Sequence, residues 1–561
     1  MKKNTIVLLI IIIFAAALRL WQLGTVPLSP DWDEAALGYN AYSIMQTGKD
    51  EYSDTLPIVL QSFGDYKPAL YVYFALPFIA LFGLDVFAVR LPSALFGILT
   101  VLATYFLVKE LFGHKTNDEE RKKTTPSSYS SYLPLLTTFL LAISPWHMQF
   151  SRVAFEANMA LSFIVFGVLF FLKGLYKPWL LVLSIISFGA SLYTYQSEKV
   201  FVPLLAITLV LIYRKQVFSL PKKVLIRSSI VVLLVCLPML YSFVTDANYL
   251  ARARGVSLLS TQDAVLKQDE DKLLKAKEQG DIMGQIIYNR RITYGKEIVS
   301  GYLAHFDLNW LFIHGDIARH HAPGMGLLYL WELPFLLIGI YLLFCMPFSR
   351  QTKLLIFLWF AIAPIPASIT NGVPHAVRTL NFLPIFQIFT AIGLVGAFAW
   401  FVSKYKMQNL KPKKIVIAYS FYLLLFILVL VNVAYYLNQY FVQQDYFNSQ
   451  EWQYGYKEAV SEVIKREGSH DKVVVANTGI LDQSYIFFLF YLQYPPADYQ
   501  KERSGEHNFE KYEFRKIDWS KEQKDGKTLY VGQKDDFSDA TTPLHQVTFL
   551  NGESGILIVD R

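Results

Sequence analysis

Three carboxylates within four residues, Asp31, Asp33 and Glu34, follow the first long apolar segment of the chain. A deprotonated carboxylate near a membrane surface can take a proton from an acceptor hydroxyl, so Asp33 and Glu34 are candidate catalytic residues. The same pattern is typical of a helix start, where a capping side chain and acids in the first turn favour the helix dipole. Both interpretations can hold together.

Glu156 is a third acidic candidate, at the start of a later apolar segment. An ionisable group is costly there, and a functional role is the default hypothesis. Arg152 lies four residues earlier and could pair with Glu156 on one helical face, which would make the pair structural. Tyr195 stands in a comparable mixture of polar and aromatic residues. We therefore predict a catalytic role for Glu156 and a place in a substrate cavity for Arg152 and Tyr195.

Basic residues at the ends of apolar segments are candidates for phosphate binding. Lys67, within Tyr66-Lys67-Pro68, could neutralise a lipid phosphate or extend its amine to the headgroups. Arg90 admits the same two interpretations, and for Arg90 we expect the headgroup contact. Tyr66 and Lys67 are therefore predicted to face a substrate.

Histidines and arginines gather in two further segments outside the apolar stretches. The first contains Arg319, His320 and His321. Imidazoles bind transition metals, but the spacing in this segment matches no tight metal motif. Hydrogen bonding and phosphate contact are therefore the favoured roles, and a divalent cation stays open as a cofactor. The second segment is rich in proline and contains His375 and Arg378. It is either a mere turn or backbone that lines a cavity, and the cavity is favoured.

The elements that position these residues must be membrane helices. The chain has 561 residues, of which 53% are hydrophobic and only 17% are charged. An ordinary soluble domain carries about 25% charged residues, so this composition excludes a soluble globular enzyme and a disordered chain. The net charge of +7 comes with Lys and Arg concentrated in short loops between apolar segments, the arrangement that orients membrane proteins. We expect no nucleic-acid partner.

Twelve apolar segments are candidate spans. If 69–84 crosses the membrane, the following loop with Lys115 and Arg121 falls outside, against the positive-inside rule. If 69–84 lies along the interface, every basic loop is cytoplasmic. The sequence therefore predicts a multi-pass plasma-membrane protein with eleven spans, a retained first span, a cytoplasmic N-terminus and an outer C-terminus. The segments are 5–23, 69–84, 91–111, 132–145, 158–174, 178–195, 199–213, 225–244, 326–346, 353–369, 380–402 and 413–437.

The candidate site residues then share the extracytoplasmic side with a C-terminal tail. In this tail, a helical stretch at 456–465 alternates with β-branched runs, which is typical of a small α/β domain. We predict a transmembrane domain over 1–437 and an extracytoplasmic α/β domain over 438–561. The predicted fold class is an α-helical polytopic membrane protein with this small added domain.

The order of these features resembles the GT-C membrane glycosyltransferases, specifically the group of protein O-mannosyltransferases and aminoarabinose transferases. The resemblance extends over residues 1–437 and lies in the order and spacing of short motifs. It implies a GT-C-like fold with juxtamembrane helices in the first outer loop. The motifs are Leu18-Arg19-Leu20, Asp33-Glu34-Ala35, Tyr66-Lys67-Pro68-Ala69-Leu70, Phe82-Gly83, Arg90-Leu91-Pro92-Ser93-Ala94, Ser151-Arg152 with Glu156, and His320-His321-Ala322-Pro323.

The resemblance also implies an activity, the transfer of a sugar from a polyprenyl-phosphate donor to a protein, lipid or glycan acceptor outside the membrane. Displacing the lipid phosphate needs a cationic cradle for the leaving group and, for inversion, an acid as base. Asp33 and Glu156 match the two acids of the family, and Lys67 and Arg319 match its phosphate-binding residues. His375 and Arg378 fall in the outer loop that covers the cavity in relatives.

Two other classes compete with a transferase. A transporter or flippase of lipid-linked sugars also needs intramembrane acids and cationic lipid contacts. Its site is expected at the midplane between repeats, whereas the candidates here gather on one face and no repeat is visible. A membrane scaffold that presents the C-terminal domain would leave Asp33, Lys67 and Glu156 unexplained. The sequence favours the transferase.

Overall fold

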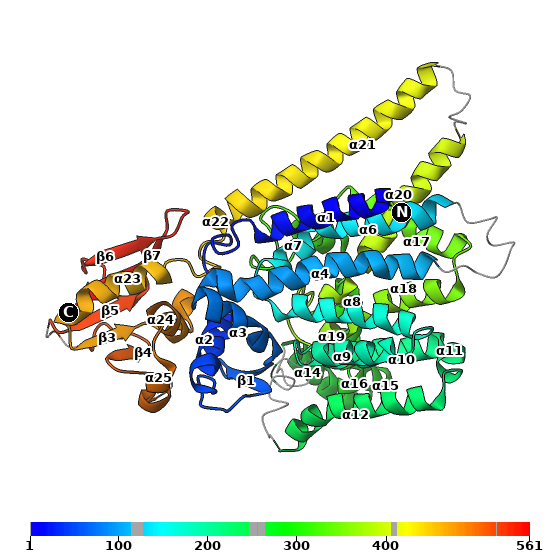
Figure 1. Ribbon diagram of the computed structural model, residues 1–561. Helices are drawn as coiled ribbons and strands as arrows, with labels where there is room; N and C mark the ends of the chain where they lie inside the picture. Colours follow the sequence, from blue (N-terminus) through cyan, green and yellow to red (C-terminus); the bar gives the residue numbers. More distant parts are fainter. Residues whose placement is uncertain are drawn as a thin grey trace.

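The computed structural model describes residues 2–113, 127–245, 255, 264–404, 412–505, 507–522, 524 and 526–561. It consists of a bundle of long helices with a small sheet domain at one end (Figure 1). Residues 32–82, from α2 to α3, lie between the two, at the end of the bundle that faces the sheet (Figure 1).

The helices account for most of the described chain. They are α1 (Lys2–Leu20), α2 (Trp32–Thr47), α3 (Leu70–Phe82), α4 (Val86–Gly113), α6 (Ser127–Ile143), α7 (Pro145–Ser151), α8 (Glu156–Gly174), α9 (Leu180–Leu192), α10 (Glu198–Ile212), α11 (Arg214–Phe218), α12 (Lys222–Thr245), α14 (Ala264–Glu278), α15 (Ile282–Ile287), α16 (Arg290–Ala304), α17 (Glu332–Cys345), α18 (Arg350–Ile362), α19 (Ile365–Ser368), α20 (Ile385–Lys404), α21 (Pro412–Asn438), α22 (Gln444–Phe447), α23 (Tyr456–Arg466), α24 (Ser484–Leu492) and α25 (Pro496–Glu502).

Each of the twelve predicted apolar segments carries a helix. Seven of the described helices are long and apolar enough to cross a membrane, judged by length and composition, and four more apolar helices are shorter. These helices mark the chain as an integral membrane protein, as predicted. The number of crossings and the orientation stay predictions. Helix α3, predicted to lie along the interface, is one of the shorter helices and lies beside α2 at the sheet end of the bundle (Figure 1).

Helices α17 and α20 pack directly on each other through two glycines. A Cβ atom at Gly339 would overlap the carbonyl of Phe389, and one at Gly393 would overlap the carbonyl of Phe335. Small residues at such a crossing let two helix backbones approach closely. The aromatic side chains of α20 are thereby brought into the interior of the bundle.

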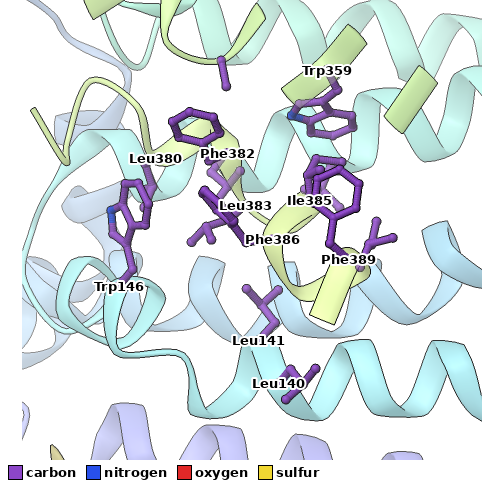
Figure 2. Packing of buried hydrophobic residues seen from close by; sticks show 14 of the residues in the cluster. Leu140, Leu141, Trp146, Trp359, Leu380, Phe382, Leu383, Ile385, Phe386 and Phe389 are labelled. Carbon is purple, nitrogen blue, oxygen red and sulfur yellow. The ribbon is translucent and has the colours of Figure 1, made fainter. Parts of the chain in front are cut away.

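An aromatic cluster in this interior anchors the chain just before α20 (Figure 2). The rings of Trp146 and Phe382 lie 6.2 Å apart. The indole Nε1 of Trp146 donates a hydrogen bond to the carbonyl of Ala376 at 3.2 Å, and that of Trp359 donates to the carbonyl of Asn381 at 2.7 Å. The core therefore holds the turn that precedes α20 at both of its ends.

The C-terminal domain contains a five-stranded sheet in the order β4-β3-β5-β7-β6. Strand β3 pairs in parallel with β4 and β5, and the remaining pairs are antiparallel. The predicted α/β domain is thus present. A separate two-stranded antiparallel hairpin, β1–β2, lies between α2 and α3 in the sequence. The strands are β1 (Val59–Ser62), β2 (Asp65–Pro68), β3 (Lys472–Val475), β4 (Tyr512–Phe514), β5 (Thr528–Gly532), β6 (His545–Thr548) and β7 (Ser554–Asp560).

The C-terminal domain docks on α2. The Tyr39 hydroxyl donates to the carbonyl of Tyr494 at 3.1 Å, and the Gln500 amide donates to the Ser43 hydroxyl at 3.0 Å. All four residues lie close to the interface between α2 and the pair α24–α25. Helix α2 is therefore fixed from two sides, by the bundle and by the C-terminal domain.

Candidate active site

Helix α2 begins with a capping box. The backbone N–H of Glu34 donates to Oδ1 of Asp31 at 2.8 Å, and the backbone N–H of Asp31 donates to Oε2 of Glu34 at 3.4 Å. These reciprocal hydrogen bonds give partners to two backbone N–H groups that the start of a helix otherwise leaves unpaired. The capping interpretation of the acidic motif is therefore correct for Asp31 and Glu34, and it sets the direction of Asp33 on the first turn.

Glu34 forms a buried ion pair with Arg90 of helix α4. The guanidinium donates from Nε to Oε1 at 2.9 Å and from Nη2 to Oε2 at 2.8 Å, and both side chains are almost completely buried. The backbone N–H of Ala154 adds a further bond to Oε1 at 2.8 Å. The prediction that Arg90 reaches to the headgroups is wrong, because a buried carboxylate offers its planar fork a bidentate partner. Glu34, a predicted catalytic residue, lies in this structural pair.

A cavity of about 210 Å³ opens next to α2. Its lining combines residues that are distant in the sequence, from the start of α2 to the turn before α20. Most of the predicted site residues meet there. These are Asp33, Lys67, Glu156, Tyr195, Arg319, His320, His375 and Arg378.

One side of this cavity, called the first wall below, is formed by residues 31–34 and the β1–β2 hairpin. Lys67 of β2 forms an ion pair with Asp33, and the Asp33 side chain is 35% exposed. The Gln196 amide donates to the carbonyl of Tyr66 at 2.9 Å, which ties the hairpin to the chain before α10. An acid and a lysine are thus held in contact at the edge of the cavity.

Another part of the lining, called the second wall below, comes from the segments 316–320 and 375–378. Nδ1 of His320 lies 2.9 Å from Oδ2 of Asp316, and the Ala376 N–H donates to the same oxygen at 2.6 Å. The rings of His320 and His375 lie 5.2 Å apart. Nε2 of His305 accepts the backbone N–H of His375 at 3.2 Å. Two loops far apart in the sequence are therefore joined through one carboxylate.

Burial controls the protonation of the second wall. It lowers the pKa of both His320 and His375, so both imidazoles are held neutral. Burial is also the largest influence on Asp316 and would raise its pKa, but His320, His375 and the Ala376 N–H together lower that pKa to about 2. The wall thus presents neutral imidazoles beside an ionised carboxylate.

Arg319 connects the two walls. Its Nη1 lies 3.3 Å from Oδ2 of Asp31, and its guanidinium lies over the Trp32 ring at 4.5 Å from the centroid. Burial raises the pKa of Asp31 to about 7, although the neighbouring Arg319 works in the opposite direction. The Gln149 amide holds the carbonyl of Arg319 at 2.8 Å. The guanidinium is therefore oriented by an acid, a ring and its own backbone.

The side chain of Arg378 is held by residues of the same loop. Its Nη1 donates to the Thr370 hydroxyl at 2.7 Å and to the carbonyl of Asn371 at 2.6 Å. With Lys67 and Arg319, Arg378 gives the cavity lining three basic side chains. This is an arrangement suited to an anionic ligand.

Four predicted residues do not line the cavity. Besides Glu34, Arg152 donates to the carbonyls of Leu18 at 2.8 Å and Val26 at 3.1 Å, so it fastens the end of α1 instead of pairing with Glu156. Nδ1 of His321 lies 2.8 Å from the carbonyl of Ala322. The fourth residue is Tyr66, whose carbonyl takes the contact from Gln196.

Sequence reasoning missed several residues of the site. Trp32 and Gln196 line the cavity, while Asp31 and Asp316 orient Arg319 and His320. Asp31 belonged to the acidic motif and Asp316 to the histidine-rich segment, so their types were a usable signal. An aromatic residue such as Trp32 is common near membranes, so its presence does not indicate a site.

Comparisons with known proteins agree with this architecture. Residues 66–117 match the model of a family described as dolichyl-phosphate-mannose-protein mannosyltransferase. The structure is similar to that of ArnT from Cupriavidus metallidurans bound to undecaprenyl phosphate, with a TM-score of 0.55 at 12% identity, over 100% of this chain and 97% of that chain. The apo structure of the same protein has a TM-score of 0.53 at 12% identity over the same shares.

An archaeal oligosaccharyltransferase, AglB from Archaeoglobus fulgidus, in complex with an inhibitory peptide and a dolichol-phosphate, aligns at 13% identity and a TM-score of 0.48. That alignment covers 87% of this chain and 63% of that chain. No curated protein matches the sequence.

The likeness to ArnT shows the fold. The predicted fold class, a polytopic helical membrane protein with a small C-terminal sheet domain, is confirmed. The family match over residues 66–117 includes the motif around Lys67 and the start of α4 with Arg90, and it agrees with the predicted resemblance to protein O-mannosyltransferases.

Proposed function

We propose that the chain is a glycosyltransferase that moves a sugar from a polyprenyl-phosphate donor to an acceptor hydroxyl on the extracytoplasmic face. The observation that carries this proposal is the cavity in which Asp33 and Glu156 face Lys67, Arg319 and Arg378. In our proposal, residues 1–437 form the catalytic membrane domain and residues 438–561 the extracytoplasmic domain.

The polyprenyl phosphate as leaving group is suggested by the similar structure of ArnT, which was solved bound to undecaprenyl phosphate. When the bond to the anomeric carbon breaks, negative charge grows on the phosphate and positive character grows on the sugar. Fixed cations aimed at the phosphate stabilise this charge in a site that excludes water. Lys67 and Arg319, which line the cavity from different walls, take this role.

Asp33 is the proposed general base. An inverting displacement needs a carboxylate on the side of the sugar opposite the leaving group, where it takes the proton of the attacking hydroxyl. Asp33 is in contact with Lys67. A donor phosphate that draws the ammonium of Lys67 to itself would release Asp33, so donor binding would also prepare the base.

Glu156 and Tyr195 lie on the same cavity and are the proposed acceptor-side residues, together with His320 and His375. Glu156 opens helix α8 and is 9% exposed. A second carboxylate at this position can hold a hydroxyl of the sugar or of the acceptor. The acceptor itself, whether protein, lipid or glycan, is left to the assay below.

The test is the release of polyprenyl phosphate from a set of polyprenyl-phosphate sugars, with purified protein in lipid and a crude envelope fraction as acceptor. Loss of a general base typically costs about 10²–10⁴-fold in rate, and we expect a loss in this range for Asp33→Asn. The control is Asp54→Asn, because Asp54 is an exposed carboxylate of the same outer segment.

Unchanged turnover in Asp33→Asn would contradict the assigned base. Movement of the intact lipid across the bilayer without release of polyprenyl phosphate would contradict the transferase and favour a transporter.

A further inference from the structure

We propose that Asp316, His320 and His375 form a binding site for a divalent transition metal at the edge of the cavity. Each of these side chains offers one ligand atom, and the three atoms lie within 4.8 Å of one another. Two imidazoles and one carboxylate form a ligand set that suits zinc and its neighbours in the first transition row.

The geometry needs only a small closure of the side chains. Zinc bonds to nitrogen and oxygen are about 2.0–2.2 Å long, which places tetrahedral ligand atoms roughly 3.4 Å apart. The His320 side chain is buried at the end of one loop, and His375 lies on the next loop with its ring centroid 5.2 Å away. Rotation of the side chains about their own bonds would close the remaining gap.

Two further observations point to a ligand at this place. Nδ1 of His375 is buried and has no hydrogen-bond partner among the described residues. Buried polar atoms in proteins almost always have one, so such an atom calls for an explanation. A metal ion held by this nitrogen would supply the partner.

The second observation is that the candidate ligands are oriented by their surroundings. Oδ2 of Asp316 is fixed by the Ala376 N–H at 2.6 Å, and the backbone of His375 is fixed by Nε2 of His305 at 3.2 Å. Metal ligands in proteins are typically supported by such outer contacts, which set ring orientation before the ion binds. An ordinary surface loop is not expected to have such supporting hydrogen bonds.

The proposed ion would leave a coordination position open. His320 and His375 both line the cavity that also holds Lys67 and Arg319. Three protein ligands and one free position are typical of zinc ions that meet a substrate. The free position would accept an oxygen of an anionic ligand. The identification of this ligand as the donor phosphate rests on the proposed function. The metal site itself does not depend on that function.

The first measurement is metal content. The full chain, purified in detergent, is treated with a chelator, incubated with zinc, freed of excess metal by gel filtration and analysed by mass spectrometry. We expect about one zinc per chain in the wild type, and loss of this zinc in His375→Asn and in Asp316→Asn. The matched control is His321→Asn, because His321 is next to a proposed ligand but its ring contacts the carbonyl of Ala322.

Absence of stoichiometric zinc in the wild type, or its retention in folded His375→Asn and Asp316→Asn, would overturn the site. A second measurement needs no variant. Cobalt in the same site should give the strong visible absorption of a tetrahedral ion, displaced by zinc. A spectrum of hydrated cobalt alone would also overturn the site.

Inorganic phosphate added to the cobalt-loaded protein should shift the spectrum if one position is open, and an unchanged spectrum would contradict the open position. These readouts do not depend on turnover. A protein that binds metal but transfers no sugar refutes the proposed function and leaves the metal site standing, whereas an active protein without metal does the reverse.

Discussion

The two walls of the cavity are built in different ways. In the first wall, residues 31–34 are held by a helix cap and by the buried pair of Glu34 and Arg90. In the second wall, two loops separated by more than fifty residues are joined by Asp316, with His305 and Trp146 behind them. Charge pairing stabilises the first wall, whereas neutral imidazoles and single hydrogen bonds stabilise the second.

The two kinds of contact respond differently to a change in the environment. A buried ion pair with bidentate geometry tolerates no loss of a partner, because the remaining charge would be left without compensation. A wall held by imidazoles changes when these are protonated or bind a ligand. We therefore expect the first wall to unfold when one partner of its ion pair is removed, and the second wall to change with pH and bound ligands.

The largest expected effect follows from breaking the first wall. Glu34→Gln would leave the buried guanidinium of Arg90 without its charge partner, which typically costs about 3–5 kcal/mol. We expect a large fall in the thermal unfolding midpoint in detergent, or loss of folded protein. The matched control is Asp33→Asn, one residue away and partly exposed, which should fold like the wild type. Equal midpoints for the two variants would contradict the structural role of Glu34.

An intermediate effect is expected from acid at the second wall. Burial lowers the pKa of His305 from 6.5 to about 4, so the folded protein binds this proton less readily than the unfolded chain does. The stabilisation is present above pH 6.5 and is lost as the pH falls towards 4, up to about 3 kcal/mol for such a shift. Protonation of Nε2 would also remove the acceptor for the His375 N–H.

The measurement is the unfolding midpoint between pH 7 and pH 4.5 for wild type and His305→Gln. The fall of the midpoint with acid should be shallower in the variant, whereas His470→Gln in the C-terminal domain should follow the wild type. Parallel curves for wild type and His305→Gln would contradict this account.

The smallest effect concerns the core behind the second wall. Trp146→Phe would remove the hydrogen bond to the carbonyl of Ala376, at a cost of about 1 kcal/mol. The matched control is Trp359→Phe, which removes the same type of bond to the carbonyl of Asn381. We expect similar losses of stability, but a raised KM for the donor only in Trp146→Phe. The same change in KM in both variants would contradict a specific effect of the hydrogen bond between Trp146 and Ala376 on the cavity.

Much of the fold could be predicted from local patterns. Every apolar segment of the expected length became a helix, and the tail contains the helix predicted at 456–465 followed by strands, as its β-branched runs predicted. Helix α24, a fully apolar stretch, and the short strand β4 were not predicted. Their periodicity is weak, since buried segments of this length carry no amphipathic signal.

The candidate site was predictable as a set of residue types but not as a geometry. Lys67 and Glu156 were found because they are charged groups at the start of apolar segments, and Arg319 was found through the family resemblance of its loop. The pairing of Arg90 with Glu34, and of Arg152 with backbone carbonyls, could not be foreseen because the partners lie on other helices.

Asp33 and Glu34 show most clearly which features are predictable from local sequence and which depend on tertiary contacts. Local sequence is enough to predict that acids begin a helix beside a membrane segment, because capping and hydrophobicity are local properties. Neighbouring residues on a helix point about 100° apart, so only one of the two acids could face the cavity while the other turned inward. Which one did so was decided by the tertiary structure, where Arg90 of α4 meets Glu34 and Lys67 of β2 meets Asp33.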